Sequence, residues 1–191
     1  MTSTSPKIAC LGWGSLCWQP KELRTAGGWQ LDGPMLPLEF TRTSDEGKGR
    51  LTLVVTPGVP EVQSLWVLLD YESLEDAREA LMVREGCLPG GVGVWPGPDE
   101  HKRLGGGTIA AWARNKGFDH VLWTALGPKF MNENGRQPTS AREAVDYLRS
   151  RPPAVFAQAE EYVRKAPLQV RTTFRTAFEE RLGWTPHQPP L

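Results

Sequence analysis

The stretch at residues 8–20, IACLGWGSLCWQP, contains an apolar run, a Gly-x-Gly turn and a terminating proline. The apolar run predicts a buried β-strand, and Gly12 and Gly14 predict a tight turn directly after it. A Rossmann dinucleotide loop is disfavoured, because Cys17 occupies the position of its third glycine and Pro20 falls where its helix would continue. We therefore expect the fold to begin with a strand and a turn of another kind.

The turn is suited to holding an anion. Its glycines let the backbone approach a ligand closely, and the successive N–H groups of Ser15, Leu16 and Cys17 can converge on a negative charge. The alternative is that the glycines serve only the geometry of the turn, while Trp13 and Trp18 belong to the core. The residues of the turn alone leave both interpretations open.

The rest of the chain changes from strand patterns to helix patterns. Apolar alternation predicts strands, and apolar residues at helical spacing between capping signals predict helices. The predicted strands cover 7–12, 37–43, 50–56, 64–71 and 119–126, and the predicted helices cover 73–86, 108–116, 140–150, 153–166 and 168–182. The second and third strands should form a hairpin, the fourth is apolar enough for a central position, and 88–107 should be a loop or broken strand. Because strands and helices are segregated along the chain, the predicted fold class is α+β.

Composition excludes several classes of partner. The 191 residues include 22 Lys and Arg and 22 Asp and Glu, and no basic run is interleaved with aromatic residues, so we expect no nucleic-acid partner. The apolar runs are far shorter than a membrane span, which needs about 20 residues, so we expect no membrane partner. The N-terminus lacks the pattern of a secretory signal, and the sequence therefore predicts a soluble cytoplasmic protein.

Cysteine and histidine usage predicts neither disulfide bonds nor a metal centre. Cys10, Cys17 and Cys87 form no paired framework, which favours free thiols in a reducing compartment. The three histidines are scattered along the chain, and none lies at zinc-ligand spacing from a cysteine or another histidine. We therefore expect no metal ion.

The first predicted helix carries a carboxylate on the face that should be apolar. Its apolar stripe consists of Leu74, Ala77 and Leu81, and Glu85 follows four residues later on the same face. A carboxyl group at a helix end, beside a glycine-rich loop, suits a general acid/base. The alternative is a structural salt bridge with Arg84 or another nearby arginine.

The motif GWGSL at residues 12–16, followed by Trp18 and Pro20, resembles the N-terminal GYGSL-x-W-x-P signature of the γ-glutamylcyclotransferases, in particular the ChaC-type, glutathione-degrading branch. Two later segments resemble that family in the same order. Residues 38–58, LEFTRTSDEGKGRLTLVVTPG, are similar to its strand–Ser–Gly-rich–strand segment, and residues 81–90, LMVREGCLPG, are similar to the helix end that carries its catalytic glutamate.

The resemblance covers roughly residues 8–95 and implies a small mixed β-barrel-like sheet with flanking helices and a helical C-terminal extension. It makes residues 7–95 the γ-glutamylcyclotransferase-like core. From the length we expect one domain spanning 1–191, which the helix-rich residues 105–191 complete. The chain departs from the signature at Trp13, where the family has tyrosine, and this change removes a hydroxyl from the turn.

The resemblance also implies a function. The chain would release 5-oxoproline from a small γ-glutamyl amide or peptide such as glutathione, with Glu85 as the acid/base and no metal or organic cofactor. The turn would hold the charged α-carboxylate end of the γ-glutamyl group. The implied substrate-binding residues are Gly12, Trp13, Gly14, Ser15 and Leu16, to which we add Arg42 as a candidate for charge complementarity.

Two alternatives to an enzyme are a binding module and an interaction protein. The first keeps the anion-binding turn to sense a small acid or amino-acid derivative without turnover. In the second, the stripe Leu168, Phe174, Phe178 and Leu182 of the last helix packs on a partner or on a second copy of the chain, as a homodimer. A nucleophilic Ser15 is disfavoured, because no histidine is placed to activate it.

Overall fold

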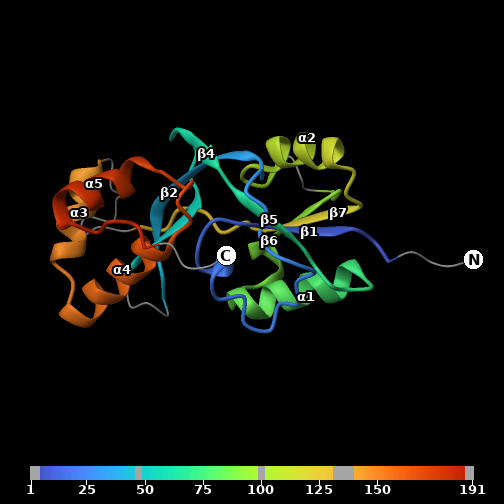
Figure 1. The fold of residues 1–191 in the computed structure, drawn as a ribbon, viewed down its shortest axis with the longest axis horizontal. Coiled ribbons are helices and arrows are strands. Elements are labelled where there is room, and N and C mark those ends of the chain that lie inside the picture. Colours follow the sequence, from blue (N-terminus) through green and yellow to red (C-terminus); the bar gives the residue numbers. More distant parts are fainter. Residues whose placement is uncertain (1–4, 46–48, 99–101, 131–139, 188–191) are drawn as a thin grey trace, which may run out of the picture.

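The computed structural model describes residues 5–45, 49–98, 102–130 and 140–187 of the chain. The first of the two sheets in these ranges has four strands in the order β5-β1-β7-β6 (Figure 1). β1 runs parallel to β7 and antiparallel to β5, and β6 runs antiparallel to β7. The strands are β1 (Ile8–Gly12), β5 (Leu65–Leu68), β6 (Val92–Trp95) and β7 (His120–Thr124). The stretch 88–107, expected to be a loop or broken strand, contains the short β6.

Each face of this sheet is covered by a helix (Figure 1). Ile8 and Cys10 of β1 pack with α1 (Leu74–Glu85), whereas Ala9 and Leu11 pack on the opposite face with α2 (Gly106–Lys116). Because successive side chains of a strand alternate between faces, a strand buried on both sides is apolar throughout. The continuous run IACL follows from this position.

The second sheet has the order β3-β2-β4 and lies beside the C-terminal helices (Figure 1). β2 (Met35–Thr43) pairs antiparallel with both β3 (Leu51–Val55) and β4 (Glu61–Gln63), which confirms the predicted hairpin. Phe40 of β2 makes edge-to-face contacts with Tyr162 and Phe178, whose ring centroids lie 6.2 and 5.6 Å away. The helices that cover this sheet are α3 (Ala141–Arg149), α4 (Pro153–Lys165) and α5 (Thr173–Leu182).

Capping residues set both ends of α1 and the start of α3 where the sequence predicts them. The Ser73 hydroxyl accepts the N–H of Asp76 at the start of α1, and Ser140 and Glu143 form a full capping box on α3. α1 ends at Gly86, whose φ of 60° lies in the left-handed region that favours glycine. A cap at each end of α1 therefore fixes Glu85 in the last turn of the helix.

Four details differ from the sequence predictions. β5 was predicted to be a central strand, but it lies at the edge of its sheet. Residues 25–30 form isolated bridges to its outer side and satisfy backbone groups there, so its apolar residues do not require a central position. α2 starts at Gly106 rather than 108, and the short β4 was not predicted. α5 starts at Thr173, with Thr172 as its cap, so Leu168 precedes the helix and is 41 % exposed.

The α+β class is confirmed. The expected barrel-like sheet is instead a pair of separate sheets, neither of which closes into a barrel within the described residues. The apolar side chains Phe174 and Phe178 of α5 are buried within the chain, so the exposed stripe that the interaction-protein alternative requires is absent at these positions.

Glu39 of β2 is buried and holds the first turn of α5. Its Oε1 accepts the N–H of Phe40 at 2.9 Å, and its Oε2 accepts the N–H of Phe174 at 3.1 Å. Burial raises the pKa of this carboxyl above its usual value, although the hydrogen bonds act in the opposite direction. A group with a raised pKa in the folded state adds stability as the pH falls through that value.

We expect the stability advantage of the wild type over Glu39→Gln to grow as the pH is lowered from about 7 to about 4. The glutamine cannot take up a proton, whereas Glu39 binds one more readily in the folded than in the unfolded chain. Urea denaturation at several pH values measures the difference, with Glu61→Gln on the exposed start of β4 as the control. A pH-independent difference would contradict the assignment.

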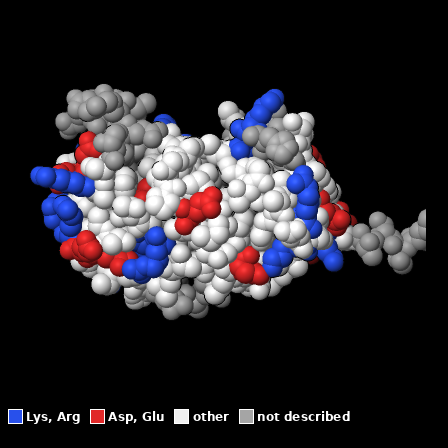
Figure 2. All heavy atoms as spheres, turned by 90° about the horizontal axis from the view of Figure 1, so that it is seen from above, with Lys and Arg blue, Asp and Glu red and all other residues white. Residues whose placement is uncertain are grey.

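Acidic and basic side chains are mixed on the face shown in Figure 2. There, blue and red side chains of the described residues alternate with uncharged ones and gather into no wide area of one sign. No helix within the described ranges is long and apolar enough to cross a membrane.

Candidate functional site

A cavity of about 850 Å³ lies where the first turn, the end of α1, the β2–β3 hairpin and α4 meet. This volume is within the range of small-molecule binding sites. Every candidate site residue predicted from the sequence lines it: Gly12, Trp13, Gly14, Ser15, Leu16, Arg42 and Glu85. The turn and the helix-end carboxylate, which are far apart in the sequence, therefore face the same space.

The turn forms a single 3₁₀ segment over Ser15–Cys17. The N–H of Cys17 donates to the Gly14 carbonyl at 2.9 Å, so the predicted contribution of Cys17 to an anion site is wrong. Within the described part of the chain, no hydrogen bond uses the N–H groups of Ser15 and Leu16. These two amides are the donors that the turn retains for a ligand.

Gly14 is required by space rather than by backbone freedom. Its φ of −127° is open to any residue, but an added Cβ would lie 2.3 Å from Oη of Tyr162. At Gly12 an added Cβ would lie 2.5 Å from the ring of Trp29. Both glycines let larger side chains pack directly against the turn.

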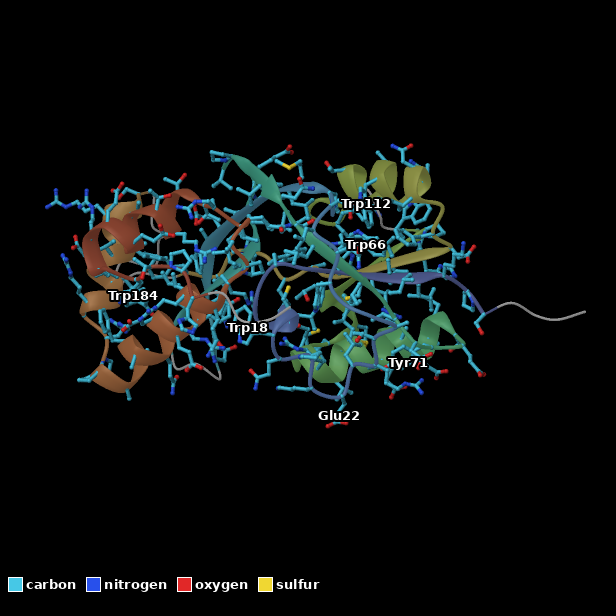
Figure 3. All side chains as sticks on the ribbon, in the orientation of Figure 1. Trp18, Glu22, Trp66, Tyr71, Trp112 and Trp184 are labelled. Carbon is cyan, nitrogen blue, oxygen red and sulfur yellow. The ribbon has the colours of Figure 1, made fainter. Side chains whose placement is uncertain are left out.

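Trp13 belongs to both the core and the cavity. Its ring is buried in the main apolar cluster, and its Nε1 donates to the carbonyl of Leu53 at 3.2 Å. Trp18 lies between α4 and α1 (Figure 3) and meets the ring of Tyr162 edge-on at 5.4 Å. The two tryptophans therefore pack in or against the core, as one interpretation of the turn expected, while the turn also lines a cavity. The core interpretation and the anion-site interpretation of the turn are compatible.

Arg84 ties Glu85 to the turn. Its Nη1 donates to Oε1 of Glu85 at 2.6 Å, and its Nη2 donates to Oγ of Ser15 at 3.2 Å and to the carbonyl of Gln19 at 2.8 Å. The side chains of Arg84 and Glu85 are only 7 % and 15 % exposed. The salt bridge weighed from the sequence is therefore present, and Glu85 nevertheless lines the cavity.

The ion pair leaves part of the carboxylate unused. Arg84 contacts Oε1, and no described residue donates a hydrogen bond to Oε2 of Glu85. A carboxylate held at one oxygen has a fixed orientation and a free acceptor at the other. This arrangement suits a group that takes up and returns a proton at one defined place.

We expect Arg84→Met to lower the free energy of unfolding by about 3 kcal/mol, because it leaves a mostly buried carboxylate without its partner. The methionine also removes the contacts that join α1 to the turn. Urea denaturation measures the loss, and Arg181→Met at an exposed position of α5 is the control. A loss no larger than that of the control would show that the pair contributes little.

The cavity carries a surplus of positive charge. Lys21, Arg42, Arg50 and Arg84 line it together with two acidic residues, Asp45 and Glu85. Arg42 is held by a hydrogen bond from its Nη1 to the carbonyl of Gly127 at 2.9 Å. Clefts lined mainly by one sign of charge attract ligands of the opposite sign, so this cavity favours an anion.

Lys21, Arg50 and Tyr162 also line the cavity, although the sequence did not point to them. Lys21 and Arg50 stand beside turns and carry no motif, and Tyr162 lies on the apolar face of α4, where the pattern indicates only core. The one available signal was the polar hydroxyl of a tyrosine on an otherwise apolar helix face.

The thiols lie near the site but are poorly suited to nucleophilic chemistry. All three cysteines are free, as predicted, and Cys87 lines the cavity. Burial raises the pKa of Cys10, Cys17 and Cys87, which keeps each of them in the thiol form near neutral pH. No group of three or more His, Cys, Asp or Glu side chains within the described ranges is arranged to hold a metal ion.

Comparison with known proteins gives a likeness of fold. No protein-family model and no curated protein matches the chain. The structure is similar to the crystal structure of a selenomethionine-labelled γ-glutamyl cyclotransferase specific to glutathione from yeast, with a TM-score of 0.48 and 17 % sequence identity. The alignment covers 96 % of this chain and 98 % of that chain. No residue role and no activity of this chain follows from this likeness.

Proposed function

We propose that the chain is a γ-glutamylcyclotransferase-like enzyme, which releases 5-oxoproline from a γ-glutamyl amide or peptide. One observation carries the proposal: the GWGSL turn and Glu85, which resemble the two functional motifs of that family, line the same cavity. The proposal takes residues 1–191 as one functional unit, because α4 contributes Tyr162 to the cavity wall.

The charge and the donors of the cavity suit the α-carboxylate of a γ-glutamyl group. The N–H groups of Ser15 and Leu16 are without partners among the described residues, and three arginines line the same space. A carboxylate bound by main-chain N–H groups and offset by nearby positive charge is a stable arrangement. Binding there fixes one end of the substrate near Glu85.

Glu85 supplies the proton transfers. In its charged form it takes a proton from the α-ammonium group of the substrate, and the freed amine attacks the γ-carbonyl carbon. The five-membered ring closes, Glu85 returns the proton to the departing nitrogen as the γ-amide C–N bond breaks, and the second proton of the ring nitrogen then passes through Glu85 to the released amine. Atoms and charge balance within the substrate and Glu85, so the reaction requires no added cofactor.

Positioning is the second contribution of the site to such a reaction. The attacking amine and the carbonyl already belong to one molecule, so the site contributes by holding the substrate in its ring-closing conformation with Glu85 beside the amine. Arg84 acts as a positioning residue, because it orients the Glu85 carboxylate and binds Ser15 of the turn at the same time.

The test is whether the purified protein releases 5-oxoproline, which is measured by mass spectrometry. The panel contains glutathione, γ-L-glutamylglycine, other γ-L-glutamyl dipeptides and γ-L-glutamyl amines, with α-L-glutamyl dipeptides as negative controls. Enzyme-dependent 5-oxoproline from at least one γ-linked compound, and from none of the α-linked ones, is the expected result. No release from any compound would contradict the proposal.

The binding module is a second candidate because Glu85 is paired with Arg84 at 2.6 Å, which is also how a purely structural carboxylate is held. Isothermal titration calorimetry with the same panel separates the two functions. Binding of a γ-L-glutamyl compound without any turnover favours a sensor of small acids or amino-acid derivatives.

A further inference from the structure

Tyr162 of α4 reaches the turn from the C-terminal part of the chain. It is 6 % exposed and lines the cavity, and its hydroxyl lies so close to Gly14 that only a glycine fits there. Its ring is fixed by Trp18 and Phe40, with centroids 5.4 and 6.2 Å away. The hydroxyl therefore occupies a defined place beside the turn.

The hydrogen of this hydroxyl has no acceptor among the described residues. Oη accepts the N–H of Leu53 at 3.4 Å, so that bond uses a lone pair and leaves the O–H free to donate. Burial raises the pKa of Tyr162 to about 12, and the group stays a neutral donor at physiological pH. A buried hydroxyl with an unused hydrogen at a cavity wall is suited to a ligand acceptor.

Arg50 adds positive charge at the same place. Its guanidinium carbon lies 5.0 Å from the centroid of the Tyr162 ring, and its Nε is buried without a hydrogen-bond partner. Arg50 also lines the cavity. The Tyr162 hydroxyl at Gly14 and the Arg50 cation over the same ring line one cavity with the turn, so together they favour a carboxylate bound in this part of the cavity.

We propose that Tyr162 is a substrate-binding residue, whose hydroxyl donates a hydrogen bond to the α-carboxylate of the γ-glutamyl group at Gly14, with Arg50 supplying the neighbouring charge. The assignment rests on the proposed function for the identity of the ligand. It gives the C-terminal helices a direct role at the site, because α4 then completes the anion site that the turn begins.

The test compares Tyr162→Phe with Tyr71→Phe, both in a Glu85→Gln background that prevents turnover. Tyr71 is a matched control because it is also buried and its hydroxyl accepts a backbone N–H, that of Arg24 at 3.1 Å, but it does not line the cavity. Calorimetry measures the affinity for γ-L-glutamylglycine and for 4-aminobutyrylglycine, the same compound without its α-carboxylate.

Tyr162→Phe should weaken the binding of γ-L-glutamylglycine about ten- to a hundredfold, as the loss of a hydrogen bond to a charged group does. It should leave the binding of 4-aminobutyrylglycine unchanged, and Tyr71→Phe should change neither affinity. Equal affinity of Tyr162→Phe and its parent for γ-L-glutamylglycine, or an equal loss for both compounds, would overturn the inference.

The outcomes separate this inference from the proposed function. Tyr162-dependent binding together with a wild type that releases no 5-oxoproline keeps the inference and refutes the enzyme. Turnover by the wild type with binding independent of Tyr162 keeps the enzyme and refutes the inference. A parent protein that binds no γ-L-glutamyl compound of the panel, and a wild type that releases 5-oxoproline from none of them, refute both.

Discussion

Replacing Glu85 by glutamine is expected to lower 5-oxoproline release by about a thousandfold, the size of effect that the loss of a general acid/base produces. Glutamine has nearly the same shape as glutamate and keeps a carbonyl oxygen that accepts the hydrogen bond from Nη1 of Arg84. The contact, 2.6 Å long in the wild type, is therefore weakened but not lost. It cannot take up a proton from the substrate amine. The fall should therefore appear in kcat, while the affinity for the γ-glutamyl compound changes much less.

The matched control is Glu79→Gln, an exposed carboxylate on the same helix and outside the cavity. It should keep the wild-type kcat. Circular dichroism and thermal unfolding establish that both variants are folded. A Glu85→Gln protein with a kcat within a fewfold of the wild type would remove Glu85 from the mechanism, whatever the fate of the binding site.

Gly14→Ala is expected to destabilise the fold by about 2 kcal/mol and to abolish detectable turnover, because the added methyl group overlaps with the hydroxyl of Tyr162. The added Cβ would lie 2.3 Å from Oη but 3.4 Å from Cζ, so the conflict is almost entirely with one oxygen. Either the ring or the turn must move, and both form the site.

A second substitution tests this explanation. In Gly14→Ala combined with Tyr162→Phe the oxygen is absent, and most of the lost stability should return, as measured by urea denaturation. Gly90→Ala is the control, because Gly90 lines the same cavity and an added Cβ there meets no atom within 4 Å. A double variant as unstable as Gly14→Ala alone would show that the glycine is needed for another reason.

The position of Glu85 could be predicted because it depends on local rules. The spacing Leu74, Ala77, Leu81 defines a helix face, Ser73 and Gly86 define its ends, and the structure follows both. The turn was predictable for the same reason, since two glycines permit a tight turn and the following proline prevents a helix from continuing within a few residues. Local sequence thus positions each half of the site on its own element.

What joins the halves depends on tertiary contacts that leave little trace in the sequence. Nothing local indicates that Arg84 will bind Ser15 and Gln19, or that Tyr162 will meet Gly14, since these contacts form only when α1 and α4 pack beside the turn. The free N–H groups of the turn were overestimated for a related reason. The 3₁₀ bond from Cys17 to Gly14 depends on the exact backbone angles rather than on residue type.

Two errors in the fold have similar causes. β5 was expected in a central position because an apolar strand is expected to be buried. Its outer edge is covered by residues 25–30 instead of by another full strand. α5 was started too early because the apolar Leu168 was counted with Phe174 and Phe178, whereas Thr172, whose hydroxyl accepts the Arg175 N–H, sets the start. Capping residues were in this case a better guide than apolar spacing.

A crystal structure of the Glu85→Gln protein with bound γ-L-glutamylglycine tests the central claim most directly. The account predicts the α-carboxylate within hydrogen-bond distance of the Ser15 and Leu16 N–H groups, and the α-amine beside residue 85. A ligand bound away from the cavity, or bound in it with its α-carboxylate turned from the turn, would contradict the claim that these two elements act on one substrate.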